Sequence, residues 1–468
     1  MSFFSNFSDK HRIKALVGLV TRHHVWHGIS AVAGMGVLVL LLTASSAQAA
    51  NITVANGEVA VAANGKCSLI EAINNANNTN NGRPHADCAA GNPNGADTIN
   101  LPNSGNFVLT APAVVAQRIG AIGLPWISSQ VTINGNDSTI RRGDQAPELR
   151  ILAVGRRGDL RLNNTTIRGG LVEVRCVDDV AYGGGGIFAE GKLTLNGSTI
   201  INNGVYMTDD SSSCYDTLGG GIFNTGQLTI SNSTITSNHI SSFQFQWGNM
   251  FAKGGGVYNE GQMAITDSSI LNNETRSDYD AAGGGIYNEG IVTINNAVIS
   301  DNVLYAYDGG DGGGIYNSFP GEITIEGSVV SGNSAGGKFG YGGGIVNGGT
   351  LTINRTLITD NSHSGESSAG GGIVNGGNLK IHKSDVTNNT SDGVDRGFGG
   401  GIATTAGEVY ITETTISGNV TSAFDKGYVF GGDIYISPRG SLTISNSTVN
   451  NNEAFNSYDD DTFSGGIA

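Results

Sequence analysis

Proline, charged residues and aromatic residues are all scarce in this sequence. Its 468 residues include 8 prolines, and Asp, Glu, Lys and Arg together make up only 14%. So little proline and charge excludes a collagen-like chain and a charged, disordered polymer. Glycine, by contrast, accounts for 73 residues, well above its usual share of about 7%. The composition favours a repetitive chain with many turns over an ordinary globular enzyme.

Long apolar runs are also missing, apart from Ile29 to Leu42 near the N-terminus. This run is shorter than the roughly 20 residues that a membrane-spanning helix needs. It follows a basic stretch and precedes Ala47-Gln48-Ala49, the pattern of a secretory signal peptide. We therefore expect residues 1–49 to be a signal peptide, with an uncleaved anchor as the alternative.

Basic residues are too few for a nucleic-acid-binding protein. The whole chain has 25 Lys and Arg against 40 Asp and Glu, a net charge of −15. Residues 1–49 hold four of the basic and one of the acidic residues, which leaves 21 against 39, or −18. Such a surface repels phosphate backbones, so we expect no nucleic-acid partner.

Cysteine and histidine are too sparse for a zinc site. No CxxC or Cys/His spacing is present, and the histidines outside the N-terminal segment are scattered. An even number of cysteines in an exported chain favours disulfides. Three pairings are open, and we favour the first cysteine with the second and the third with the fourth. The four are Cys67, Cys88, Cys176 and Cys214.

A repeated phrase fills the chain from about residue 184 onward. It reads GGGIFNTGQLTISNSTITSN in one unit and GGGIYNEGIVTINNAVISDN in another, and the units are 28 to 35 residues apart. Fainter versions begin at Gln130 and Gly158, which makes about eleven units. Runs such as LTI and VTI predict three-residue strands with an apolar inner face. Because such strands bury a face only by stacking, we expect an all-β single-stranded parallel β-helix of about eleven coils.

Asparagine recurs at one position in every unit, and a shorter second column runs from Asn224 to Asn375. In stacked coils these side chains would form a hydrogen-bonded ladder. The alternative is that they bind a ligand, but a position filled in every coil is more simply structural. The ladder positions are Asn203, Asn238, Asn273, Asn302, Asn333, Asn361, Asn389, Asn419 and Asn452.

The repeats resemble the GGAI and FxxN repeats of polymorphic outer membrane proteins and related bacterial right-handed parallel β-helix proteins. The resemblance covers roughly residues 130–468, with GGGI or GGGV in place of GGAI. In addition, the run CSLIEAI from Cys67 to Ile73 resembles the CSLREA-type N-terminal motif of exported bacterial β-helix proteins. The resemblance implies a right-handed solenoid and a protein that is secreted or lies on the bacterial outer-membrane surface.

The motif also implies a division of the chain. We expect residues 50–112 to be an N-terminal cap and first coil, and residues 113–468 to be the repeats. Leu69, Ile73 and Ala76 at helical spacing predict one short helix that closes the apolar end. The sequence stops in the opening phrase of a further coil, so we expect a C-terminal cap or anchor to be missing. An exposed coil end would favour end-to-end self-association.

Length variation is confined to the segments between each ladder asparagine and the next glycine triplet. We expect these segments to be loops along one edge of the rod, with a polysaccharide or protein ligand as partner. The equally weighted alternative is that their aromatic residues merely cover the side sheets. The candidate contact residues are Tyr206, Tyr215, Phe243, Trp247, Tyr279, Tyr305, Tyr307, Tyr341 and Tyr428.

Catalysis is the rival interpretation, because parallel β-helices include pectate lyases and polygalacturonases. The acidic pairs Asp178/Asp179 and Asp209/Asp210 are weak candidates for Ca²⁺ ligands, and we expect no other cofactor. The motifs of those enzymes are not found in the sequence, and fold alone does not make an enzyme. We therefore expect a non-catalytic adhesion or binding rod. The alternatives are a polysaccharide lyase or glycoside hydrolase acting on an anionic polysaccharide, and a purely structural rod.

Overall fold

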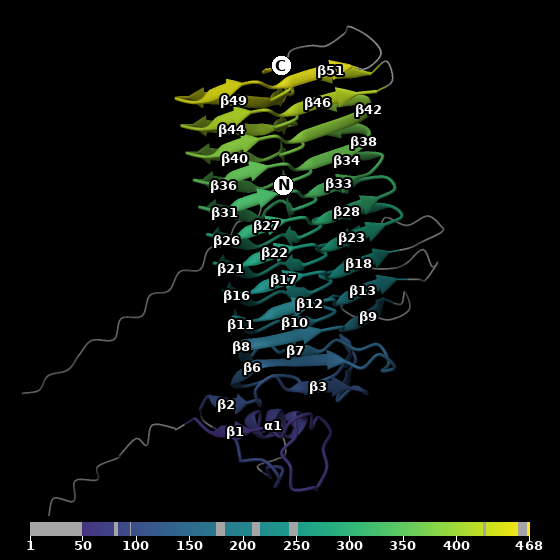
Figure 1. Cartoon of the computed structure of the whole chain (residues 1–468), viewed down its shortest axis with the longest axis vertical. Helices are drawn as coiled ribbons and strands as arrows, with labels where there is room; N and C mark the ends of the chain where they lie inside the picture. Colours follow the sequence, from purple (N-terminus) through teal and green to yellow (C-terminus); the bar gives the residue numbers. More distant parts are fainter. Residues whose placement is uncertain are drawn as a thin grey trace, which may run out of the picture. The chain divides into compact units, whose positions relative to one another are not determined.

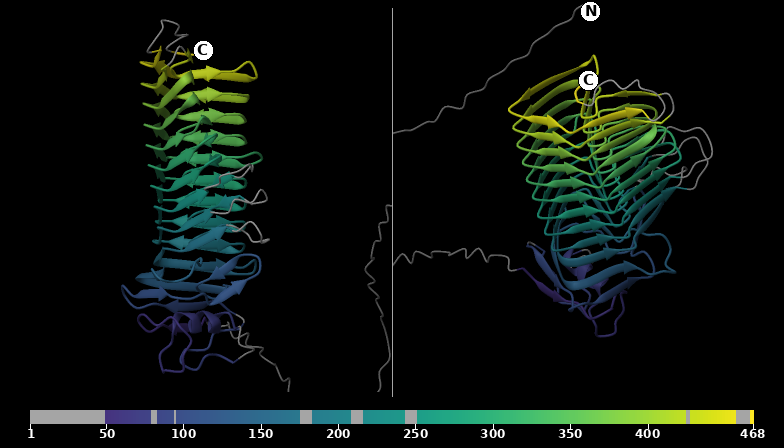
Figure 2. Two further views of the ribbon diagram at one scale, coloured as in Figure 1. Left: turned by 90° about the vertical axis from the view of Figure 1, so that its right-hand side faces the viewer. Right: turned by 45° about the horizontal axis from the view of Figure 1, so that its top comes forward.

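The computed structural model describes residues 49–78, 83–93, 95–174, 183–207, 216–242, 251–424, 427–456 and 466–468. The chain divides into two units, Met1–Ser46 and Ala47–Ala468, and only the second is described below. This second unit is a parallel β-solenoid of about eleven turns, as the repeats predict. Figure 1 shows the coils stacked one on another, and Figure 2 shows the same stack from two further directions.

Sheet 1 carries the main apolar face of the solenoid. Each regular coil contributes to this sheet a five-residue strand followed by a three-residue strand. The strands that contain LTI were expected to be three residues long; they are longer because the residues on either side also pair. Leu228 and Ile230 of one coil lie in register with Met263 and Ile265 of the next, and all four are buried in one continuous core. Within the described residues sheet 1 comprises β1 Asn51–Thr53, β2 Asp97–Asn100, β3 Asn106–Leu109, β6 Gln130–Arg142, β8 Asp159–Arg168, β11 Lys192–Asn196, β12 Thr199–Ile201, β16 Gln227–Ser231, β17 Thr234–Thr236, β21 Gln262–Thr266, β22 Ser269–Leu271, β26 Ile291–Asn295, β27 Val298–Ser300, β31 Glu322–Glu326, β32 Val329–Ser331, β36 Thr350–Asn354, β37 Leu357–Thr359, β40 Asn378–His382, β41 Asp385–Thr387, β44 Gly407–Thr412, β45 Thr415–Ser417, β49 Gly440–Ser445 and β50 Thr448–Asn450.

Sheet 2 is built from the three residues that follow each glycine triplet. Ile222 pairs with Val257, and Val257 pairs with Ile286, so equivalent residues overlie each other as the repeat predicts. These residues point into the core shared with sheet 1, and the middle residue of each strand points to the opposite face. Its described strands are β7 Leu152–Val154, β10 Ile187–Ala189, β15 Ile222–Asn224, β20 Val257–Asn259, β25 Ile286–Asn288, β30 Ile315–Asn317, β35 Ile345–Asn347, β39 Ile373–Asn375, β43 Ile402–Thr404 and β48 Ile434–Ile436.

Sheet 3 corrects one expectation, because the variable segments contain strands and not only loops. In most of the described coils one strand leads away from the solenoid and a second leads back, whereas Ser362–Ala369 and Thr390–Phe398 each form one continuous strand. All of them pair in parallel with their equivalents in neighbouring coils. We call this layer the arm (Figure 1). A small core of residues such as Val205, Ile240 and Leu304 lies inside the arm. Its described strands are β9 Leu171–Val174, β13 Gly204–Met207, β14 Thr217–Leu218, β18 His239–Ser242, β19 Phe251–Lys253, β23 Glu274–Ser277, β24 Asp280–Ala282, β28 Val303–Ala306, β29 Gly310–Asp311, β33 Ser334–Gly336, β34 Phe339–Tyr341, β38 Ser362–Ala369, β42 Thr390–Phe398, β46 Val420–Ala423, β47 Tyr428–Phe430 and β51 Glu453–Asn456.

The glycine triplets make the turn from the arm into sheet 2. Gly283, the first of one triplet, has a φ of +69°, a conformation that L side chains rarely adopt. At Gly285, the third, a Cβ atom would lie 2.8 Å from the Gly314 carbonyl oxygen and 2.9 Å from the Asn302 side chain. The triplet therefore combines a left-handed turn with close contact between coils.

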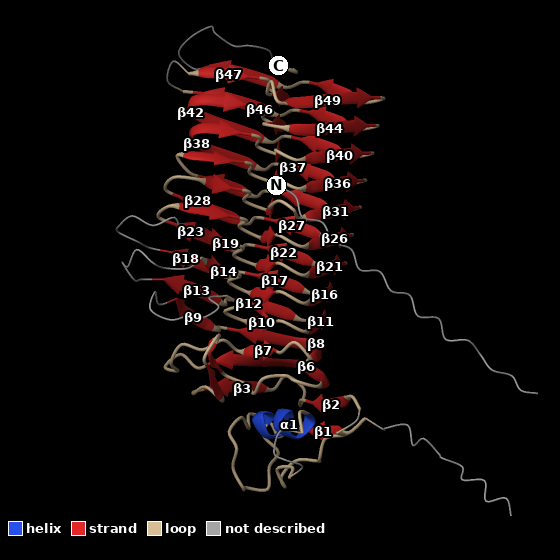
Figure 3. Cartoon of the chain, turned by 180° about the vertical axis from the view of Figure 1, so that it is seen from behind, coloured by secondary structure: helices blue, strands red, loops and turns tan. Residues whose placement is uncertain are grey.

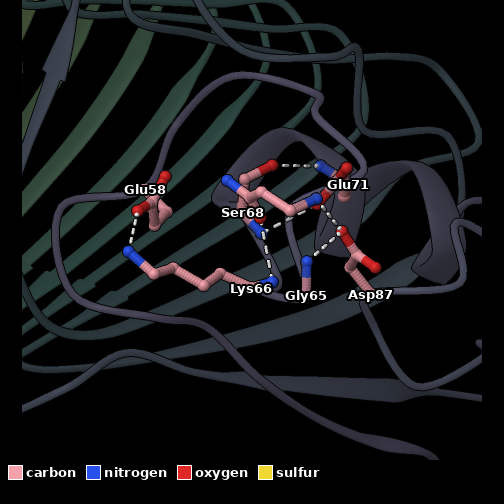
Figure 4. Close-up of polar contacts among 7 residues, drawn as sticks. Glu58, Gly65, Lys66, Ser68, Glu71 and Asp87 are labelled. Atoms are coloured by element: carbon pink, nitrogen blue, oxygen red, sulfur yellow. Dashed lines mark hydrogen bonds and ion pairs between the residues drawn. The ribbon is translucent and has the colours of Figure 1, made fainter.

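The N-terminal cap contains α1, Leu69–Ala76, which is the only helix among the described residues (Figure 3). Leu69, Ile73 and Ala76 are buried in the solenoid core, as their spacing predicts. Ser68 caps the helix: its hydroxyl accepts from the Glu71 N–H, and the Glu71 carboxylate accepts from the Ser68 N–H (Figure 4). An antiparallel pair, β4 Val114–Ala116 and β5 Gly120–Ile122, follows the cap.

A disulfide joins Cys67 to Cys88, the first of the two pairings favoured above. It links the residue just before the helix cap to the segment that follows the helix. Cys176 and Cys214 lie outside the described residues. No helix in the described part of the chain has both the length and the apolar character that crossing a bilayer requires.

Candidate functional site

The stacked asparagines form two hydrogen-bonded ladders inside the solenoid. In the column from Asn203 to Asn452, each side-chain N–H donates to the next side-chain oxygen at 2.9–3.2 Å. In the column from Asn224 to Asn375 the same contacts measure 2.7–2.9 Å. The amides from Asn203 to Asn419 are fully buried. A ligand therefore has no access to them, and their role is structural.

The outer face of sheet 2 carries a stack of five aromatic rings, one from each of five successive coils. Their centroids are 5.0–5.3 Å apart and their planes are nearly parallel. The spacing follows from the strand separation of about 4.8 Å in a parallel sheet. The returning strands of the arm lie against this face, because Leu218 and Ala282 pack on the rings. The stack consists of Phe188, Phe223, Tyr258, Tyr287 and Tyr316.

A pocket of about 320 Å³ opens at the corner between the arm and the aromatic stack. We call it the arm pocket. Four rings line it: Tyr287 and Tyr316 come from the stack, and Phe251 and Phe339 come from the arm. Phe339 is 53% exposed, so the rim of the pocket is accessible to solvent. This mixture of apolar walls and a few polar groups is typical of small-ligand sites.

Lys253 lies at one end of the arm pocket. Its Nζ is 5.2 Å from the centroid of the Tyr287 ring and 5.3 Å from that of Phe251. The same ammonium forms an ion pair of 2.6 Å with Asp216. Two rings and a carboxylate thus already hold one cation in this corner.

Two carboxyl groups, Asp280 and Asp311, line the rest of the arm pocket. Burial raises the pKa of Asp311 to about 7; a hydrogen bond from the Tyr341 N–H opposes the shift, and the nearby charge of Asp280 adds to it. Burial also raises the pKa of Asp280, against a 2.9 Å hydrogen bond from the Gly309 N–H. The low polarity of the corner therefore makes negative charge costly unless a cation compensates it.

The pKa values of tyrosine hydroxyls in the aromatic stack, in and beside the pocket, are also raised by burial. Burial raises the pKa of Tyr316 to about 12, and the charges of Asp311 and Glu289 add to the shift. The pKa of Tyr258 is raised too, by burial and by Glu260, whose carboxylate accepts from its hydroxyl at 3.0 Å. These phenols stay protonated and can act as hydrogen-bond donors.

The described aromatic residues proposed from the sequence all belong to the arm segments, but they lie on different parts of the arm. Side chains alternate between the two faces of a strand, and Tyr206 and Tyr305 lie on the outer face of the outgoing strands. There the Tyr206 hydroxyl donates to Glu148 at 2.7 Å, and the Arg276 guanidinium lies over the Tyr305 ring. Tyr279 and Tyr307 lie between the outgoing and returning strands. Tyr341 and Tyr428 belong to the returning strands. Tyr215, Phe243 and Trp247 lie outside the described residues.

The floor of the arm pocket was not predicted from the sequence. Tyr287 and Tyr316 follow the glycine triplets, where the regular repeat was interpreted only as a core strand. An aromatic residue at this position in five successive units was the signal that could have revealed the stack. Asp311 lies two coils from Lys253 in the same column, and only the register of the coils brings them to one pocket.

Metal binding finds no support in the described residues. They contain no group of three or more His, Cys, Asp or Glu side chains that could hold an ion. The Ca²⁺ candidates Asp178, Asp179, Asp209 and Asp210 all lie outside the described residues. Comparison with protein-family models, with curated proteins and with solved structures gave no match to this chain.

Proposed function

We propose that this protein is an exported, non-catalytic rod that binds a polysaccharide along the corner between the arm and sheet 2. The observation that carries the proposal is the arm pocket, which is lined by four aromatic rings and two carboxyl groups, with Phe339 exposed at its rim. Aromatic faces pack against the apolar faces of sugar rings, and carboxyl and phenol groups hydrogen-bond to sugar hydroxyls. The N-terminal segment and the CSLREA-like motif support export to the cell surface or medium.

A polysaccharide suits this corner better than a folded protein. Specific protein interfaces usually bury about 800 Å² on each partner, whereas the arm pocket is a small concave site. The aromatic stack continues from the pocket along the rod through Tyr258 and Phe223. Because Tyr258 and Phe223 are only 3% and 6% exposed beneath the arm, a sugar chain would contact the protein at the pocket and not along the whole stack.

Binding of neutral and charged oligosaccharides to residues 50–468, measured by calorimetry, tests the proposal. We expect Tyr316→Ala and Phe339→Ala to weaken binding at least about tenfold each, since stacking contacts are removed. Tyr410→Ala is the matched control, because Tyr410 is an exposed tyrosine on sheet 1. Absence of binding to every glycan, or equal loss in the control, would contradict the proposal.

Hydrolysis is the second candidate, and the raised pKa of Asp311 is the observation that favours it. A carboxyl whose pKa burial raises to about 7, with a second carboxyl lining the same pocket, resembles the acid and partner carboxyl of a glycosidase. Release of reducing ends from a polysaccharide, abolished by Asp311→Asn and kept in Asp385→Asn, would establish hydrolysis and overturn the non-catalytic assignment. Asp385 is an exposed residue of sheet 1.

A further inference from the structure

The corner beside sheet 2 already shows how this chain holds an ammonium group. Lys253 Nζ lies over the rings of Phe251 and Tyr287 and pairs with the carboxylate of Asp216. Cation–π contacts gain strength where water is excluded. The lysine is therefore an internal example of the ligand chemistry that this surface stabilises.

The next two coils repeat the rings and carboxylates but not the lysine. Lys253 is in register with Ala282, and Ala282 with Asp311, so a carboxyl takes the lysine position. Phe251 is in register with Asp280, which adds a second carboxyl. Tyr316 and Phe339 supply the rings. The end of the arm pocket formed by Asp280, Asp311 and Phe339 thus has the parts of an ammonium site, while the Lys253 ammonium lies at the other end.

The charges of the pocket also favour a cation. Among the described residues that line the pocket, Lys253 is the only basic one, and the carboxylate of Asp216 already neutralises its charge. No ion pair of Asp280 or Asp311 occurs among the described residues. A uronic acid would bring a third negative charge to this corner, and a ligand ammonium would compensate the two present.

We propose that the arm pocket holds the ammonium group of an amino sugar, with the sugar ring against the exposed Phe339 ring and the edge of Tyr316, and the nitrogen between Asp280 and Asp311. This inference rests on the polysaccharide-binding function proposed above and names its substrate class. A polymer of non-acetylated hexosamine has this chemistry. The expected ligand is therefore cationic, unlike the anionic polysaccharide considered for a lyase.

Three hexasaccharides distinguish the substrate classes, measured by calorimetry at pH 7.5 with residues 50–468. They are the hexamers of glucosamine, of N-acetylglucosamine and of galacturonic acid. We expect the glucosamine hexamer to bind at least tenfold more tightly than the acetylated hexamer, and the galacturonic acid hexamer to bind most weakly. Asp280→Asn and Asp311→Asn should each reduce this preference at least fivefold while leaving affinity for the acetylated hexamer unchanged.

Asp385→Asn is the matched control, because it removes one charge from the opposite part of the coil and lies outside the pocket. If Asp385→Asn weakens glucosamine binding as much as the pocket variants do, attraction to the acidic protein as a whole explains the result and the inference is wrong. Equal affinity for the glucosamine and acetylated hexamers also overturns it and leaves the proposed function intact. Tighter binding of hexalysine than of the glucosamine hexamer overturns it in favour of a basic peptide. Failure of all three sugars to bind contradicts the proposed function itself.

Discussion

At the residue scale, one buried amide per coil is the most regular feature of this protein. The asparagine column was predictable, because a polar residue that recurs once per coil must satisfy its hydrogen bonds within the stack. A further polar column, of hydroxyl groups, was not predicted: Ser198, Ser233 and Ser268 accept from a backbone N–H of the preceding coil. Serine is so common in this sequence that its spacing did not distinguish a buried hydroxyl from an exposed one.

Asn302→Ala tests the asparagine ladder. The side chain donates to Asn333 at 2.9 Å and to the Ile270 carbonyl at 3.0 Å, and it accepts from the Asn273 side chain and N–H. Its removal leaves buried partners unsatisfied, so we expect a loss of about 2–4 kcal/mol in the free energy of unfolding. Urea unfolding followed by circular dichroism measures it. Asn378→Ala, at an exposed position of sheet 1, should change stability by less than about 0.5 kcal/mol; equal effects would contradict the structural role.

Gly285→Ala tests the close contact between coils at the third glycine of a triplet. The added Cβ would lie 2.8 Å from a backbone oxygen, and the parallel register leaves that oxygen no room to move. We expect a loss of about 1–3 kcal/mol from overpacking. Gly376→Ala is the control, since its Cβ would lie 3.4 Å from Thr405 Oγ1 and 3.7 Å from the Asn347 carbonyl oxygen, which are ordinary contact distances. A melting temperature equally lowered in both variants would show that contact distance is not the cause.

At the scale of elements, the regular strands were predictable and the arm was not. Alternating residues such as Leu228 and Ile230 give a local pattern for sheet 1. The arm strands have no such pattern: β38 reads SHSGESSA and β42 reads TSDGVDRGF. They are extended because each pairs with the coil above and below, a constraint that local propensity does not contain. The variable length of the segments therefore indicated loops when the structure contains paired strands.

Ser68→Ala tests the cap of α1 as an element of its own. The change removes the hydroxyl that accepts from the Glu71 N–H, whereas the backbone N–H of residue 68 can still donate to the buried Glu71 carboxylate. We expect a loss of about 1 kcal/mol, the usual effect of an N-cap. Hydrogen exchange of the α1 amides should accelerate by a corresponding factor of about five. Ser441→Ala, at an exposed position of β49, should leave those amides unchanged, and unchanged exchange in both variants would contradict the role of the cap.

At the scale of the whole molecule, stacking creates properties that no single coil has. The arm pocket takes residues from β19, β24, β29 and β34, one strand from each of four successive coils, and from the aromatic stack. Its place could be predicted only from the register of the coils, which depends on how each variable segment folds. The sequence therefore predicted the solenoid well and the pocket poorly.

Stacking also buries titratable groups. The buried carboxyl groups and the buried imidazoles change the pH dependence of stability in opposite directions. Burial raises the pKa of both Asp311 and Asp433 to about 7 from an ordinary 3.8, so their folded forms bind protons more tightly than the unfolded chain. For them stability falls as pH rises from about 4 to about 7. Burial lowers the pKa of His363 to about 4 from 6.5, so for this residue stability falls as pH drops from 6.5 to 4.

Among the described residues, burial shifts the pKa of more carboxyl groups than imidazoles. Burial also raises the pKa of three further carboxyl groups, Asp97, Asp280 and Glu260. It lowers the pKa of one further imidazole, that of His239. We therefore expect the solenoid to be more stable at pH 5 than at pH 8, as the urea midpoint at each pH measures. The high negative charge of the chain acts in the same direction, because acid reduces self-repulsion.

Asp311→Asn separates the buried carboxyl from this general charge effect. The amide carries no charge at either pH, so the variant should be more stable than the parent at pH 8 and little changed at pH 5. The difference between the urea midpoints at pH 5 and pH 8 should therefore be smaller for this variant than for the parent protein. Asp385→Asn removes the same charge from an exposed position and should leave the difference nearly as it was. Equal shrinkage in both variants would mean that net charge, and not the burial of Asp311 in the arm pocket, governs the pH dependence.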